Sequence, residues 1–115
     1  MRELLQRGAV VDAAENDGAT PLFIASQNNH LEVVQELLAR GAAVDAAEID
    51  GWTPLLMASQ EGHLEVVREL LARGASPSTA ANNGATAHSS ATASGHAAVA
   101  VLIRAALARA RRTRA

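Results

Sequence analysis

Residues 50–75 read DGWTPLLMASQEGHLEVVRELLARGA, and residues 17–42 read DGATPLFIASQNNHLEVVQELLARGA. The two stretches lie 33 residues apart and keep the same turn glycine, proline and aliphatic residues at matching positions. Self-similarity at a fixed period of this size indicates one supersecondary unit stacked on copies of itself. The chain is therefore predicted to be a repeat array whose unit is defined by this stretch.

Each unit carries the signals of a turn followed by two helices. In the first copy, residues 16–18 form an Asn-Asp-Gly turn sequence. Thr20 is a good N-cap, and Pro21 suits the first helical position. Residues 31–40 place their aliphatic side chains on one face at helical spacing, and Gly41 comes next as a left-handed C-terminal residue. The second copy repeats this order.

The runs G-x-T-P-L, G-H-L-E-V-V and L-L-A-R-G-A resemble the ankyrin repeat family, over almost the whole chain. The resemblance implies an all-α fold, an ankyrin-repeat solenoid of stacked helix-turn-helix units with β-turn tips. It divides the chain into a partial N-terminal repeat with an outer helix only (1–14), two regular repeats (15–47 and 48–80), and a degenerate C-terminal repeat with an arginine-rich tail (81–115).

Both ends of the array are expected to be weak. The outer helix around Leu4 and Leu5 lacks its inner helix, as in a chain cut from a longer array, and leaves an uncovered apolar face that extends to Val10. Such a face predicts self-association. In the third repeat, His88 occupies the position of a core leucine, and the stretch 87–94 is a poor helix by propensity. The tail 111–115 is expected to fray.

Composition excludes several classes of protein. Cysteine is absent, which rules out disulfides, thiol catalysis and cysteine-ligated zinc. No apolar run reaches the length of a membrane span, and the first residues lack the apolar core of a signal peptide. We expect an intracellular, cytoplasmic protein with no membrane partner.

The polar residues that recur in each repeat do not indicate a catalytic site or a metal site. The histidines His30, His63 and His96 recur at the repeat period. Stacked helices lie about 8–10 Å apart, whereas zinc–nitrogen bonds measure about 2 Å, so these side chains do not share one ion. The resemblance implies that each ties the turn between its helices. Ser26 and Ser59 lack a base. We therefore expect no enzyme, no metal, no cofactor and no small-molecule substrate.

The expected function is protein–protein interaction. The resemblance implies that a partner protein binds a concave surface made of the turn tips and the exposed side of the inner helices. Trp52 is the residue most typical of an interface hot spot, although a role in covering the neighbouring turn would explain it equally well. Carried over position by position, the implied partner-binding residues are Asn16, Asp17, Ala19, Gln27, Asn28, Ile49, Asp50, Trp52, Gln60, Glu61, Asn82, Asn83 and Ala85.

Three alternatives stay open. The segment could be a structural spacer in a larger ankyrin-repeat protein. The arginine-rich C-terminus could bind nucleic acid or another anionic surface, although it is short and lacks interleaved aromatic residues. The sequence could also be a designed one, against which the decayed third repeat argues.

The charge distribution predicts that nucleic-acid binding is weak. The net charge is −2, and the five arginines from Arg104 onward leave −7 on the rest of the chain. That acidic body repels a polyanion, so we predict binding no tighter than roughly 10⁻⁴ to 10⁻⁶ M at physiological salt. Fluorescence anisotropy with a labelled duplex and a labelled single strand measures this affinity. Submicromolar binding that disappears when the chain is cut after Leu107 would identify the tail as a nucleic-acid site instead.

Overall fold

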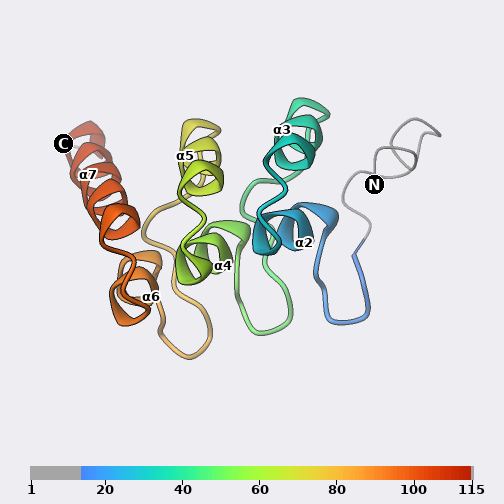
Figure 1. Cartoon of the computed structure of the whole chain (residues 1–115), viewed down its shortest axis with the longest axis horizontal. Coiled ribbons are helices and arrows are strands. Elements are labelled where there is room, and N and C mark those ends of the chain that lie inside the picture. The colour runs from blue at the N-terminus through green and yellow to red at the C-terminus, as the bar shows by residue number, and fades with distance from the viewer. Residues whose placement is uncertain (1–13, 115) are drawn as a thin grey trace.

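The computed structural model describes residues 14–114, and it describes side chains up to residue 110. Within that range lie three helix pairs: α2 (Pro21–Gln27) with α3 (Leu31–Ala39), α4 (Pro54–Glu61) with α5 (Leu64–Ala72), and α6 (Ala87–Ala93) with α7 (Ala97–Arg114). The short inner helices α2, α4 and α6 form one row, and the outer helices form a second (Figure 1). The predicted all-α solenoid is confirmed. Residues 14–114 contain no strand, only an isolated bridge between Ala80 and Thr86.

The partial N-terminal repeat and the predicted uncovered face at Leu4, Leu5 and Val10 lie outside the described residues. Among the helices that the structure describes, none combines the length and apolar character that crossing a membrane requires.

The inner helices α2 and α4 begin directly after their threonine N-caps, as the sequence predicts. The Thr20 hydroxyl accepts a hydrogen bond from the Phe23 N–H at 3.2 Å, and the Thr53 hydroxyl accepts one from Leu56 at the same distance. A proline comes after each cap in the first turn, where its missing N–H costs nothing. These two features start the inner helices in a fixed register.

The core is a thin aliphatic layer between the two rows of helices. Its largest fully buried side chains are leucines, isoleucine and valines, among them Leu22, Leu37, Leu55, Val67 and Ile103. Because each helix pair contributes only a few of these side chains, a pair is stable only when its neighbours cover it.

Main-chain hydrogen bonds join the turn tips of successive repeats. The N–H of Ile49 donates to the Asp17 carbonyl at 2.8 Å, and the N–H of Asn82 donates to the Asp50 carbonyl at 2.9 Å. The approach is close: a Cβ added to Gly51 would lie 2.6 Å from the Asn82 side-chain oxygen. The tips therefore form a continuous hydrogen-bonded edge along the lower side of the solenoid (Figure 1).

The repeated histidines also join neighbouring repeats. His63 Nε2 lies 2.9 Å from the Gln27 carbonyl oxygen, at the end of the preceding inner helix. The ring of His96 also reaches the preceding repeat, where it packs over Gly62, since a Cβ there would come within 2.6 Å of its ring atoms. The implied structural role therefore includes a contact across the repeat boundary, beyond the turn within one repeat.

The third repeat departs from the second at four positions that are apolar in α4 and α5. Four core-facing positions in α4 and α5, Leu55, Leu56, Val67 and Leu71, lie beside α6 and α7. Their counterparts on the open face of the third repeat are polar or small: His88, Ser89, Ala100 and Arg104.

His88 takes the position that Leu55 has in the second repeat, but it does not lie in a core among the described residues. Leu55 is 1% exposed, whereas His88 is half-buried. The third helix pair thus carries polar and small side chains where the second carries core leucines and a valine.

Two further expectations for this repeat are corrected. The stretch predicted to be a poor helix forms α6, because Thr86 and Ser89 make a reciprocal capping box with bonds of 3.1 and 2.9 Å. The tail expected to fray continues α7 to Arg114. Alanine, leucine and arginine favour helix, and no glycine or proline interrupts the chain after Gly95.

The contact between Gly62 and His96 predicts different costs for the same substitution in two repeats. Gly62 and Gly95 both adopt left-handed conformations, with φ of 77° and 79°. Alanine at either site costs about 1–2 kcal/mol in backbone strain. At Gly62 the new methyl also meets the His96 ring, which adds about 1–3 kcal/mol, whereas nothing lies within 4 Å of that position at Gly95.

Urea unfolding of Gly62→Ala and Gly95→Ala, monitored by circular dichroism, measures the difference. We expect the Gly62 variant to be clearly the less stable of the two. Equal losses would show that the histidine ring moves aside at no cost.

Candidate protein-binding surface

A groove of about 470 Å³ lies between the first and second repeats, where their turn tips meet the inner helices α2 and α4. Its apolar wall is made by Ala19, Phe23, Ile24, Trp52 and Met57. Its polar rim carries Gln27 and Gln60 from the inner helices and four carboxylates from the tips, namely Glu15, Asp17, Glu48 and Asp50. The groove therefore combines an aromatic wall with a strongly acidic edge.

Trp52 is held in the wall of the groove by its own turn. Its indole is half-buried and packs against the core cluster. The backbone N–H groups of Trp52 and Asp50 both donate to Glu48 Oε1, at 3.0 and 2.9 Å. Trp52 therefore packs against the core and also lines the groove.

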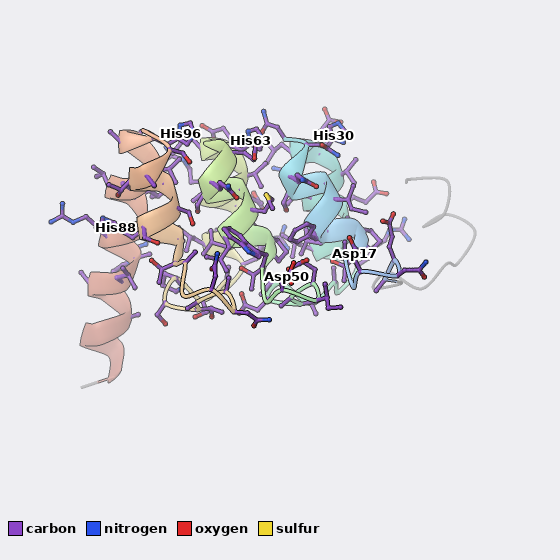
Figure 2. All side chains as sticks on the ribbon, turned by 90° about the horizontal axis from the view of Figure 1, so that it is seen from below. Asp17, His30, Asp50, His63, His88 and His96 are labelled. Carbon is purple, nitrogen blue, oxygen red and sulfur yellow. The ribbon has the colours of Figure 1, made fainter. Side chains whose placement is uncertain are left out.

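The two tips present their acidic residues side by side. Asp17 and Asp50 lie at equivalent positions on neighbouring turns, as Figure 2 shows. Asp17 Oδ1 accepts a hydrogen bond from the Ala19 N–H at 3.0 Å, which fixes the first turn. Both carboxylates are exposed.

Arginines of the outer helices lie away from this groove. Arg40, Arg68 and Arg73 pair with glutamates of their own helices, with N–O distances of 4.0, 3.8 and 3.0 Å. Among the residues with described side chains, no arginine lines the groove. Negative charge is thus concentrated on the inner face.

The structure brings six of the expected binding residues together: Asp17, Ala19, Gln27, Asp50, Trp52 and Gln60 line the groove. Ala19 differs from the expectation of an exposed contact, because it is only 4% exposed and forms part of the wall. Ile49 is 70% exposed at the second tip. Asn16, Asn28 and Glu61 are exposed outside the groove.

The expected residues of the third repeat do not reach the groove. The Asn82 side chain donates to the Ile49 carbonyl at 3.3 Å, and Asn83 Oδ1 accepts from the Ala85 N–H at 3.0 Å. Asn82 therefore ties two tips together, and Asn83 holds its own turn in shape. Ala85 is half-buried.

Sequence reasoning missed five lining residues: Glu15, Phe23, Ile24, Glu48 and Met57. A signal for the glutamates was present, because Glu15 and Glu48 recur at the repeat period immediately before their turns. The apolar residues carried no such signal, since they lie on the inner helices among core positions.

The histidine, acidic and serine residues considered as metal ligands or nucleophiles do not come together as a site in the part of the chain that the structure describes. No group of three or more His, Asp or Glu residues there is placed to hold a metal ion. Ser26 and Ser59 are fully buried within the inner helices, so their hydroxyls do not reach the surface. Both serines act as small packing residues.

A family model for ankyrin repeats, described as occurring in many copies, matches residues 1–38 and 22–71. The matched residues cover more than half of the sequence, so the chain belongs to the ankyrin repeat family. Proteins of this family generally bind other proteins and are typically non-catalytic. No curated protein matches the sequence.

The double hydrogen bond at Glu48 predicts that this side chain stabilises the second tip. Glu48→Ala removes the acceptor for two N–H groups, so we expect a loss of about 1–3 kcal/mol in the free energy of unfolding. Trp52 is the only tryptophan, so its emission should also shift to the red as the turn loosens. Glu48→Gln keeps the accepting oxygen and serves as the control. Unchanged stability and emission in the alanine variant would show that the turn holds its shape without this cap.

Proposed function

We propose that this protein is a non-catalytic recognition module that binds a segment of another protein in the groove between its first two repeats. The observation that carries the proposal is the half-buried Trp52, which lines a concave site of about 470 Å³. Tryptophan is enriched among the residues that dominate binding energy at interfaces. A groove offers such a residue a place to contact a partner on several sides.

The mechanism is display on a rigid scaffold. Thr20 and Thr53 fix the starts of the inner helices, and the tip-to-tip hydrogen bond from Ile49 to Asp17 fixes the distance between the acidic edges. Because the site is held in place before binding, little ordering cost is paid when a partner docks. The spacer alternative requires no such site.

Selection of a random displayed peptide library on the intact protein tests this proposal. Backbone and indole NH shifts map each selected peptide, and we expect changes at Trp52, Met57 and Gln60. Truncating a hot spot costs about 2 kcal/mol or more, so Trp52→Ala should weaken binding about 30-fold. Arg68→Ala on the outer helix is the matched control and should bind normally.

A negative selection would count against the proposal. If the library yields no binders, or only binders that shift outer-helix amides, the groove is not a recognition site and the spacer function is favoured. Circular dichroism of both variants establishes that they are folded.

A further inference from the structure

The chemistry of the groove identifies the kind of side chain that it accepts; this step rests on the proposed function. We infer that the groove selects partner segments that carry an arginine, with the guanidinium against Trp52 and between the carboxylates of the two tips. Three features of the molecule support this inference: the charge of the groove, its aromatic wall, and the contrast between the two repeat junctions.

The charge of the groove is unbalanced. Four carboxylates line it, and across the described part of the chain no ion pair joins Glu15, Asp17 or Asp50 to a cation. Glu48 and Asp17 each accept backbone hydrogen bonds within their own turns, whereas Glu15 and Asp50 have no such role, and all four carry negative charge toward a ligand. A concave site lined by one sign of charge concentrates ligands of the opposite sign.

The aromatic wall favours arginine over lysine. Tryptophan is the strongest cation–π partner among the side chains, and a planar guanidinium stacks on it while pairing with carboxylates through parallel N–H groups. Trp52 lines the same groove as Asp17 and Asp50, which lets one guanidinium meet both kinds of group. Met57 and Ile24 supply apolar surface for the methylene stem of that arginine.

The junction between the second and third repeats provides an internal comparison. At the positions of Glu48, Asp50, Trp52 and Met57, the third repeat has Ala81, Asn83, Ala85 and Ser90. Both acids, the indole and the thioether are lost together, although the backbone of the turn is kept. Of the two junctions between described helix pairs, only the first therefore has acidic residues on both of its tips.

Other occupants fit this groove less well. An acidic segment or a nucleic acid is repelled by the carboxylates. A neutral apolar segment would cover Asp50 and Asp17 without pairing them, and burying an unpaired charge is costly. An arginine satisfies the carboxylates and the indole at once.

A matched peptide pair tests the inference on the full chain. One short peptide carries a single arginine between two leucines, and the other carries citrulline, a neutral side chain of nearly the same shape, in that place. NMR titration at millimolar peptide monitors the Trp52 indole NH and the Gln60 amide. Since a desolvated cation–π contact and one charge-assisted hydrogen bond are each worth roughly tenfold, we expect the arginine peptide to bind at least about tenfold more tightly.

Two charge variants locate the effect. Asp50→Asn should reduce the preference for arginine over citrulline by about threefold or more, because it removes one carboxylate without changing its size. Glu65→Gln removes the same charge from the outer helix α5 and should leave the preference unchanged. Raising the salt concentration should reduce the preference of the unsubstituted protein for the arginine peptide over the citrulline peptide, since salt screens exposed charges.

The possible failures are distinguishable. Equal affinity for both peptides, with shifts in the groove, would overturn the arginine inference and leave the proposed function intact. The same holds if library binders map to the groove but contain no arginine. If neither peptide shifts groove resonances at millimolar concentration, the inference fails, and the library selection then decides whether the groove binds protein segments at all.

Discussion

Each helix pair of this protein buries its apolar face only against its neighbours, and every other feature depends on that constraint. Leu22 and Leu55 are fully covered because another pair stacks against their own. The histidine contact from His63 to Gln27 and the main-chain bond from Ile49 to Asp17 both cross the same boundary. Each boundary between the described helix pairs is thus held by core packing, by a histidine contact and by a main-chain hydrogen bond between the tips.

The regular part of this fold was predictable from the sequence because its signals are local. Thr53 before Pro54 predicts a helix start from the chemistry of one turn, and the aliphatic spacing in residues 64–72 predicts the face that the outer helix buries. The third repeat was predicted less well. Whether His88 lies in a core depends on whether another helix covers α6 in space, and no local pattern contains that information.

The candidate site was predicted only in part, for a related reason. Trp52 stands out because its equivalents are Ala19 and Ala85, and Asp50 was included because it lies in the same turn. Their neighbours in the groove, such as Phe23 and Met57, come from two different repeats and resemble core residues in the sequence. The groove exists only once two repeats are placed side by side. The residues that line it can therefore be predicted only when the distance between the repeats is known.

Two of the bonds between successive tips join main-chain atoms, with the N–H of one repeat donating to the carbonyl of the preceding repeat. The glycines at their turns are constrained by this close approach, but the neighbouring side chains at positions 49 and 50 take little part in holding the edge together. Random mutation is therefore tolerated at these positions by the scaffold. Natural selection is free to change the side chains displayed along this edge while the architecture that presents them stays the same.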